Sequence, residues 1–236
     1  MNQFYAPNIL SDNTLPEEES HHAVKVLRLQ AGDSILVMDG KGTMYHATIA
    51  VAHPKHCVLN SLEKVDTIRT RNYHLHIAIA PTKNMDRLEW FVEKAAEIGI
   101  DEISPIFCTF SERKVLKNDR IEKILVSAMK QSMQPYLTKL NEPCAFNAFL
   151  KRVSLFDGQK FIGHCHSGEK EMLAKAVQPN GKYLIMIGPE GDFSEEEVAE
   201  AVRNGFTPIS LGDMRLRVET AALYSCSVVA VKNQLS

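Results

Sequence analysis

The stretch YLIMIGPEGDFSEEEV, residues 183–198, decides the fold class of this chain. Its first five residues form a continuous apolar run, which is typical of a strand buried on both faces. Two glycines around a Pro-Glu pair then make a tight turn, and Ser194 with Glu197 form the capping box that begins a helix. A buried strand followed directly by a capped helix is the repeating unit of an α/β domain with a parallel sheet.

The same alternation extends through the rest of the chain from residue 73. Leu88, Phe91 and Val92 have the spacing of one helix face, and Gly99 is placed to end that helix. Asp119 with Glu122 predicts a second capping box. Strands are predicted at residues 75–79, 103–107, 160–165, 183–187 and 209–211, and helices at residues 88–96, 121–129, 194–204 and 218–232. Helices between successive strands predict a parallel sheet covered on both faces.

The first part of the chain has the pattern of a small β domain. The segment DGKG at residues 39–42 predicts a tight turn, because glycine tolerates positive φ. Strands are predicted at residues 35–38, 45–51 and 57–62, and a short helix at residues 16–27. The polar segment 63–72 has no consistent period and marks a boundary. We therefore expect one domain over residues 1–70, a small barrel with one helix, and a second over residues 73–236.

Composition excludes several classes of protein. The 236 residues are 44% hydrophobic and 24% charged, which is ordinary for a globular chain. The formal net charge is −2, so any nucleic-acid site must rest on a local basic patch. The five cysteines are scattered and form no CxxC pair, which disfavours a disulfide framework or a zinc site. With no secretory leader or membrane-length apolar run, we expect a cytoplasmic protein that binds neither membrane nor metal.

Two segments are candidates for chemistry. Residues 187–193 lie at the carboxyl end of a predicted strand, where α/β sheets bind ligands. The carboxylates that follow, at residues 195–197, would repel a phosphate there. The second segment is SLGDMRLRVETA, residues 210–221, a loop between the last strand and the last helix. Both could instead be ordinary connections, the first a β-to-α turn and the second a solvated loop with Glu219 and Thr220 at a helix start.

Neither segment belongs to a common nucleotide motif. No G-x-G-x-x-G follows a predicted strand, and there is no Walker A motif. These absences weaken a dinucleotide-binding site and a methyltransferase of the Rossmann type.

The segments IGPEGDFSEEEV and SLGDMRLRVETAAL resemble the C-terminal signature of the RsmE family. These proteins are 16S ribosomal RNA uracil-N3 methyltransferases of the SPOUT superfamily. The N-terminal HHAVKVLRLQAGD and the central DRLEWFVEKAAEIGIDEISPIF extend the resemblance over nearly the whole chain, in the same order.

The resemblance implies an α/β fold in which a small PUA-like β-barrel domain precedes a SPOUT domain with a C-terminal trefoil knot. It also implies a homodimer that uses S-adenosylmethionine and acts on N3 of a uridine in 16S rRNA or the small ribosomal subunit. The implied cofactor-binding residues are Ile187, Gly188, Pro189, Gly191, Ser210, Leu211, Gly212 and Leu216.

Arg217 and Glu219 are the candidate catalytic residues. Uracil N3 carries a proton that must leave before or during methyl transfer. Arg217 could stabilise negative charge on the uracil oxygens, and Glu219 could accept the proton or serve only the helix start.

Basic residues in two places are candidates for contacts with RNA phosphates. Lys25 and Arg28 belong to the N-terminal motif. The other candidates are Arg113 and Lys114, followed by Lys117, Arg120 and Lys123. This second set could equally be a solvated helix face balanced by acidic neighbours. The segment His164-Cys165-His166 is interpreted as a strand with alternating faces rather than a metal site.

Three residues depart from the family pattern: Asp192 replaces a second glycine, while Met214 and Gln134 stand where arginines are common. The departure at Asp192 should matter little if only the backbone contacts the cofactor. The other two put specific RNA contacts in doubt. Two alternatives to the main hypothesis remain: a non-catalytic RNA-binding or ribosome-assembly protein, and a related methyltransferase for another base or for transfer RNA.

Overall fold

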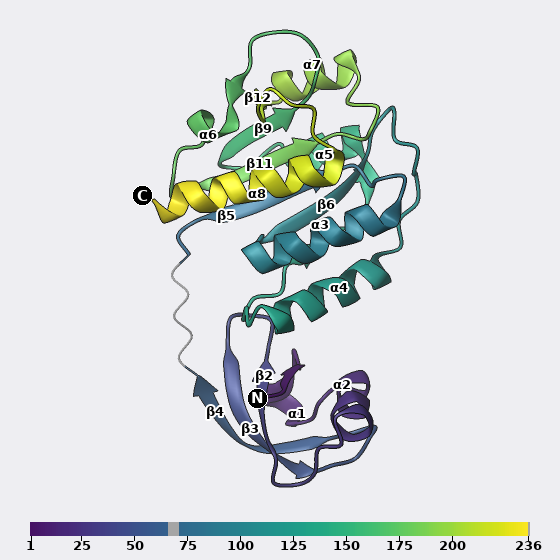
Figure 1. Cartoon of the computed structure of the whole chain (residues 1–236), viewed down its shortest axis with the longest axis vertical. Helices are drawn as coiled ribbons and strands as arrows, with labels where there is room; N and C mark the ends of the chain where they lie inside the picture. The colour runs from purple at the N-terminus through teal and green to yellow at the C-terminus, as the bar shows by residue number, and fades with distance from the viewer. Residues whose placement is uncertain (66–70, 236) are drawn as a thin grey trace. The chain divides into compact units, whose positions relative to one another are not determined.

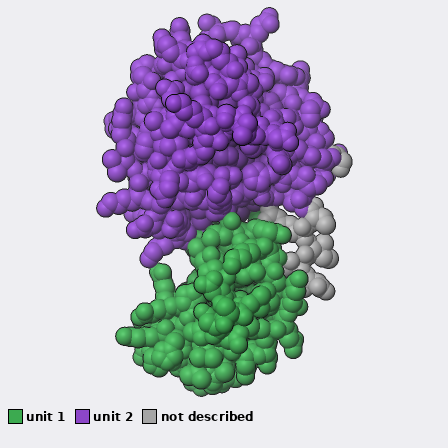
Figure 2. All heavy atoms as spheres, turned by 180° about the vertical axis from the view of Figure 1, so that it is seen from behind, with its two compact units in different colours: residues 1–70, 126–137 green, residues 71–125, 138–236 purple. Residues whose placement is uncertain are grey.

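The computed structural model describes residues 1–65 and 71–235, shown as a cartoon in Figure 1. The chain divides into two compact units, coloured separately in Figure 2. Unit 1 contains residues 1–70 and 126–137, and unit 2 contains residues 71–125 and 138–236.

Unit 1 is built on a four-stranded sheet in the order β1-β2-β3-β4, in which β1 is parallel to β2 and the other pairs are antiparallel. The strands are β1 (Gln3–Tyr5), β2 (Ser34–Met38), β3 (Met44–Val51) and β4 (Val58–Val65). Phe4, Ile35 and Ile49 are fully or almost fully buried in its core. Residues 63–65, expected to lie in a linker, belong to β4, whereas residues 66–70 of that expected linker lie outside the described residues.

The helical part of unit 1 differs from the single helix expected at residues 16–27. After the short α1 (Ile9–Asp12), α2 (Glu17–His21) continues into a π-helical turn, η1 (His22–Val26). The chain leaves this turn through Arg28, whose φ of 57° is left-handed. Such a residue ends a helix by turning the chain sharply, and glycine usually occupies it.

Residues 126–137 belong to unit 1 because they pack against residues that are distant in sequence. Met129 and Leu137 pack against Met38 and Met44 of the sheet. The N–H of Leu137 donates to the carbonyl of Gly40 at 2.9 Å. The end of α4 (Asn118–Gln131) therefore shares the core of unit 1.

Unit 2 contains an eight-stranded parallel sheet with the order β10-β12-β9-β11-β5-β6-β7, and β8 also pairs with β6. The strands are β5 (His74–Ile79), β6 (Glu102–Phe107), β7 (Lys139–Leu140), β8 (Cys144–Ala145), β9 (Gln159–Gly163), β10 (Glu171–Met172), β11 (Lys182–Ile187) and β12 (Thr207–Ser210). The helices besides α4 are α3 (Met85–Ile98), α5 (Phe146–Arg152), α6 (Leu173–Ala176), α7 (Glu195–Arg203) and α8 (Val218–Gln234).

Helices cover both faces of this sheet, as the alternating pattern predicted. In Figure 1, α3 and α8 lie together across one face. On the other face, Phe149 of α5 and Ala201 of α7 pack against Leu184 and Met186 of β11. Burying each of the three larger side chains, Phe149, Leu184 and Met186, contributes on the order of 1.5–3 kcal/mol, which holds the sheet between its layers.

The local signals at helix ends were informative but not uniformly correct. The capping box at α7 is confirmed: Ser194 Oγ accepts from the N–H of Glu197 at 3.2 Å, and Glu197 Oε2 accepts from the N–H of Ser194 at 2.9 Å. Gly99 ends α3 with a φ of 102°. The capping box expected at Asp119 is wrong, because α4 begins one residue earlier and Asp119 lies in its first turn.

The strand expected at residues 160–165 ends at Gly163. Gly163 pairs with Ile187 and Ile209 near the ends of both neighbouring strands, so the ladder has no partners beyond it. His164, Cys165 and His166 therefore lie in a loop, and the interpretation of this segment as an alternating strand is wrong.

Candidate active site

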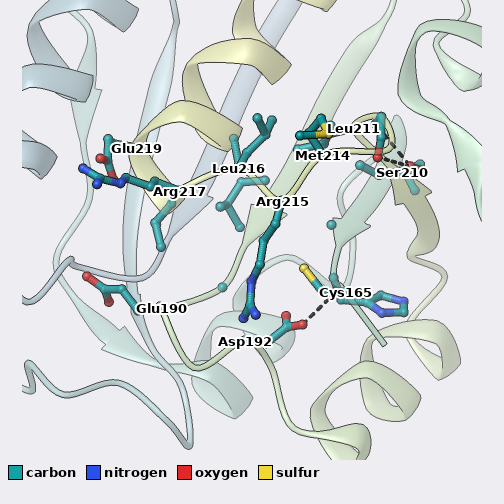
Figure 3. Close-up of a pocket in the computed structure, with 18 of the residues that line it drawn as sticks. Cys165, Glu190, Asp192, Ser210, Leu211, Met214, Arg215, Leu216, Arg217 and Glu219 are labelled. Atoms are coloured by element: carbon teal, nitrogen blue, oxygen red, sulfur yellow. Dashed lines mark hydrogen bonds between the residues drawn. The ribbon is translucent and has the colours of Figure 1, made fainter. Parts of the chain in front are cut away.

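A cavity of about 550 Å³ lies in unit 2 at the carboxyl ends of β9, β11 and β12 (Figure 3). β9 lies between β11 and β12, and after the short edge strand β10 the chain enters β11 on one side of β9 and then crosses back to β12 on the other. Ligands of open α/β sheets bind where the strand order reverses in this way. The loops that follow these three strands form the walls of the cavity, together with the start of α8 and Arg87 of α3.

The two motif segments meet in this cavity. The residues expected to hold a cofactor that line it are Ile187, Gly188, Pro189, Ser210, Leu211, Gly212 and Leu216. Gly191 does not line the cavity, although its neighbours Glu190 and Asp192 do. The sequence indicated that the two segments would be close, because each follows a predicted strand and parallel strands end at the same edge of a sheet.

The glycines of the turn after β11 are required by close packing. A Cβ on Gly188 would lie 2.9 Å from the Phe193 ring, and a Cβ on Gly191 would lie 2.9 Å from Cβ of Phe110. Such distances are shorter than real Cβ contacts, so a side chain at either position would displace its neighbour. Gly212 is different, because its φ of 115° requires glycine while a Cβ there would meet no atom within 4 Å.

Arg217 and Glu219 lie next to each other at one edge of the cavity (Figure 3). Arg217 occupies the N-cap position of α8 and its side chain is exposed. Glu219 lies in the first turn of α8 with its side chain only 10% exposed, and its Oε1 is 3.9 Å from Nε of Arg87. No pattern in the sequence distinguished Arg87 from the other residues of its helix.

Similarity to known proteins identifies the family of this chain. Residues 69–230 match the family described as RNA methyltransferase domain, and residues 15–60 match the RNA methyltransferase PUA domain. A protein named Ribosomal RNA small subunit methyltransferase E from Mesomycoplasma hyopneumoniae is 30% identical, over 70% of this chain and 74% of the relative. This chain belongs to the ribosomal RNA small subunit methyltransferase E family.

Other members of this family and solved structures agree over almost the full length. The protein of the same name from Buchnera aphidicola is 29% identical over 98% of this chain and 87% of its own. The crystal structure of a probable rRNA-methyltransferase from Porphyromonas gingivalis has a TM-score of 0.91 and 35% identity, covering 100% of this chain and 99% of the other. A putative methyltransferase from Legionella pneumophila, solved with the bound cofactor SAM, has a TM-score of 0.86 and 25% identity, with coverages of 98% and 97%.

Asp192, which departs from the pattern of this family, has a defined structural role. Its φ of 69° is left-handed, the conformation for which glycine is suited. Its Oδ1 accepts from the N–H of Phe193 at 2.8 Å, and its Oδ2 accepts from the N–H of Cys165 at 2.7 Å. Asp192 thus keeps the backbone shape of a glycine and ties the loop after β11 to the loop after β9. The expectation that this departure matters little overlooked that link.

The other two departures lie in different units. Met214 is 80% exposed, and the neighbouring Arg215 lines the cavity with its guanidinium pointing towards Asp192 (Figure 3). Gln134 belongs to unit 1, where its N–H donates to the carbonyl of Met129 at 3.0 Å.

The candidate RNA-contacting residues differ in their exposure and in the bonds that they form within the protein. Lys25 and Arg28 of unit 1 and Lys114 of unit 2 are exposed. Arg113 is half-buried and donates to the carbonyls of Thr82 at 3.3 Å and Lys83 at 2.9 Å. Its guanidinium therefore fixes the connection between β5 and α3. Among the remaining candidates, Arg120 forms an ion pair with Glu89 at 2.7 Å.

Within residues 1–65 and 71–235, no group of three or more His, Cys, Asp or Glu side chains is arranged to hold a metal ion. No helix in the same described ranges is long and apolar enough to span a bilayer.

Proposed function

We propose that this chain transfers the methyl group of S-adenosylmethionine to N3 of a uridine in 16S rRNA of the small ribosomal subunit. The observation that carries the proposal is the meeting of both motif loops in one cavity, with Arg217 and Glu219 at its edge. Membership of the small-subunit methyltransferase E family supports the reaction and the class of RNA. The Legionella pneumophila structure with bound SAM supports the cofactor.

The residues of the cavity suit S-adenosylmethionine. Ile187, Leu211 and Leu216 offer apolar surface to a purine, and Gly212, where a Cβ would meet no atom within 4 Å, lets the backbone approach a ligand closely. Glu190 presents a carboxylate to the same cavity, where it would meet the positive charge of the ligand. The remaining proposed cofactor contacts are made by Pro189 and Ser210, whereas Gly191 would act by shaping the turn between Glu190 and Asp192. When bound, the cofactor supplies an electrophilic methyl group on a sulfonium.

Arg217 would stabilise the negative charge that develops on the uracil, and Glu219 would accept its N3 proton. Removing the N3 proton leaves negative charge on the two uracil oxygens, which the exposed Arg217 guanidinium is free to meet at the cavity edge. Glu219 would accept the proton, since its carboxylate lies beside Arg217 at the edge of the cavity.

RNA recognition would combine unit 1 with the surface around the cavity. Uracil N3 lies on the Watson–Crick edge, so the target base must be unpaired or flipped out. Lys25, Arg28 and Lys114 would bind phosphates, and Arg113 would contribute while keeping its structural bonds. Residues 1–70 would serve as the RNA-binding domain and residues 73–236 as the methyltransferase domain. A C-terminal trefoil knot, a homodimer and a cytoplasmic location complete the proposal.

Nucleoside analysis of rRNA from a strain lacking the gene tests the proposal. We expect 3-methyluridine to disappear from small-subunit RNA and to return when the wild-type gene is restored, but not the Arg217→Ala variant. An unchanged level of 3-methyluridine would refute the proposed reaction. Loss of a different methylated base, or of one in transfer RNA, would identify a related methyltransferase with another substrate.

A further inference from the structure

Glu219 presents to the cavity a carboxylate that no hydrogen bond satisfies. Its side chain is only 10% exposed and lines the cavity. Its ion-pair partner is Arg87, whose Nε lies 3.9 Å from Oε1, and the carboxylate accepts no hydrogen bond from residues 1–65 or 71–235. Neither carboxylate oxygen is closed off by protein. Buried polar side chains are almost always hydrogen-bonded, so an accessible exception beside a cavity indicates that a ligand supplies the partner.

Arg87 of α3 has N–H donors that the described part of the chain does not use. Its side chain is 39% exposed and lines the cavity. The 3.9 Å contact with Glu219 is too long for a hydrogen bond, and the guanidinium forms no other contact of this kind with the described residues. None of its nitrogens is closed off by protein. A guanidinium carries five N–H donors in one plane, so Arg87 can bind a ligand oxygen while it stays beside Glu219.

Arg217 lies next to Glu219 and supplies a second guanidinium (Figure 3). It occupies the N-cap position of α8 and is exposed, and its side chain forms no hydrogen bond or ion pair within the two described ranges. The edge of the cavity therefore carries two cations and one carboxylate, all with unused hydrogen-bonding capacity. A ligand that fits there must offer acceptors to the arginines and a donor to Glu219.

The elements that carry Arg87 and Glu219 are helices packed against each other. Arg87 lies in the first turn of α3, Glu219 lies in the first turn of α8, and α3 packs along α8. The start of α3 is capped by Asn84, whose side chain accepts from the N–H of Asp86 at 3.0 Å. Sites on packed helices hold their geometry better than sites on loops, so the two side chains can act together on one small group.

The Watson–Crick edge of uracil has the complementary pattern, because its N3–H donor lies between two carbonyl acceptors, O2 and O4. In the proposed reaction the N3–H bond breaks, its proton goes to Glu219, and N3 takes the methyl group as S-adenosylhomocysteine leaves. The negative charge of the uracil is shared by both oxygens, which lie on opposite sides of N3. With the methyl group arriving between them, one guanidinium meets one oxygen and leaves the other for a second cation.

We propose that Arg87 is a second uracil-binding residue, which donates to one carbonyl oxygen while Arg217 donates to the other. This inference rests on the proposed function, because it assumes that uracil is the base that is methylated. Cytosine carries an amino donor in place of O4, and a guanidinium, which has no acceptor, would leave that donor unpaired. The two arginines thus select uridine as well as stabilise its anion.

Arg87→Met tests the inference in methyl transfer to unmodified small subunits. Methionine keeps an unbranched side chain and removes the cation. We expect kcat to fall on the order of 100-fold, the cost of removing one donor to a developing oxyanion, while the Kd for S-adenosylhomocysteine by calorimetry stays within a few-fold of the wild type. Lys94→Met is the matched control, since Lys94 lies on the same helix, bonds Glu93 and Glu97, and does not line the cavity. A wild-type kcat in Arg87→Met would overturn the inference.

Two further comparisons separate contact with uracil from indirect effects. In small subunits assembled with 5-fluorouridine RNA, fluorine withdraws charge from the ring, so the loss of kcat in Arg87→Met should shrink several-fold. An equal loss on both substrates would show that Arg87 only supports the fold, and would overturn the inference. Arg87→Met should also lower kcat further in a Glu219→Gln background. No further loss there would overturn the inference by showing that Arg87 acts only through Glu219.

A thermal unfolding scan shows whether Arg87→Met folds. If it does not, Arg87→Lys decides the matter: it keeps the cation with fewer donors, and its smaller loss of kcat should likewise shrink with 5-fluorouridine. An equal loss on both substrates in this variant would overturn the inference. A wild type that transfers no methyl group to N3 of either substrate would refute the proposed function itself, whereas a normal wild type with no effect at Arg87 refutes only this inference.

Discussion

Replacing Asp192 tests whether its carboxylate joins two walls of the cavity. Asp192→Gly keeps the left-handed backbone without strain and removes the acceptors for Cys165 and Phe193. Two charge-assisted hydrogen bonds at about 1.5 kcal/mol each would be worth about 3 kcal/mol. Relief of the left-handed strain returns about 1 kcal/mol, so the expected net loss of unfolding free energy is about 2 kcal/mol.

The comparison with a second variant makes this magnitude testable. Asp192→Ala loses the same two bonds but keeps the left-handed strain, so it should be less stable than Asp192→Gly by about 1 kcal/mol. Asp192→Asn retains one side-chain acceptor and tolerates the conformation, and should lie between Asp192→Gly and the wild type.

Urea denaturation followed by tryptophan fluorescence measures these differences. Trp90, the single tryptophan of the chain, lies on α3 and reports on unit 2. A stability of Asp192→Gly equal to the wild type would show that the carboxylate does not hold the loops together. An Asp192→Ala variant as stable as Asp192→Gly would show that the left-handed backbone is not maintained.

Four other perturbations have defined outcomes. Arg217→Ala should lower turnover by about 100-fold while leaving the Kd for S-adenosylmethionine within a few-fold of the wild type; equal loss in both would contradict a role towards the uracil. Gly188→Val should abolish cofactor binding measured by calorimetry, because its side chain would collide with the Phe193 ring; normal affinity would remove this turn from the site. Burial lowers the pKa of His76 from 6.5 to about 4. The folded state therefore binds a proton less readily than the unfolded state, so the contribution of His76 is complete above about pH 6.5 and is lost as the pH falls towards 4. The shift corresponds to an upper limit of about 3 kcal/mol, and urea denaturation of His76→Gln should show a shallower pH dependence over this window. Arg28→Gly should be as stable as the wild type or more stable by up to about 1 kcal/mol, because glycine suits the left-handed position. The same variant should bind small-subunit RNA more weakly in a filter assay, because it lacks the phosphate contact. Unchanged RNA affinity would exclude Arg28 from the interface.

The sequence predicted those parts of the fold that depend on local signals. The Ser194–Glu197 capping box and Gly99 located helix ends because their bonds and dihedral angles involve only neighbouring residues. The strand-and-helix alternation predicted the parallel sheet, since each strand of unit 2 that carries a long apolar run is buried. Family resemblance added the PUA-like unit and the class of enzyme, which the comparisons support.

The features that were missed depend on residues distant in sequence. β7 and β8 have two residues each, too few for a period, and exist because β6 pairs with them. Met129 ends the helix predicted at residues 121–129, and only its packing against Met38 and Met44 of unit 1 shows where its side chain is buried. Asp192 looked like a tolerated replacement because its partner at Cys165 is 27 positions away.

Methyl transfer by the purified protein to unmodified small subunits, using S-adenosylmethionine with an isotopically labelled methyl group, tests the central claim most directly. Mass spectrometry of the digested RNA should find the label in 3-methyluridine, at one site, and Arg217→Ala should reduce it strongly. Label in another nucleoside, or none from a protein that binds S-adenosylmethionine and RNA, would contradict uridine N3 methylation by this chain.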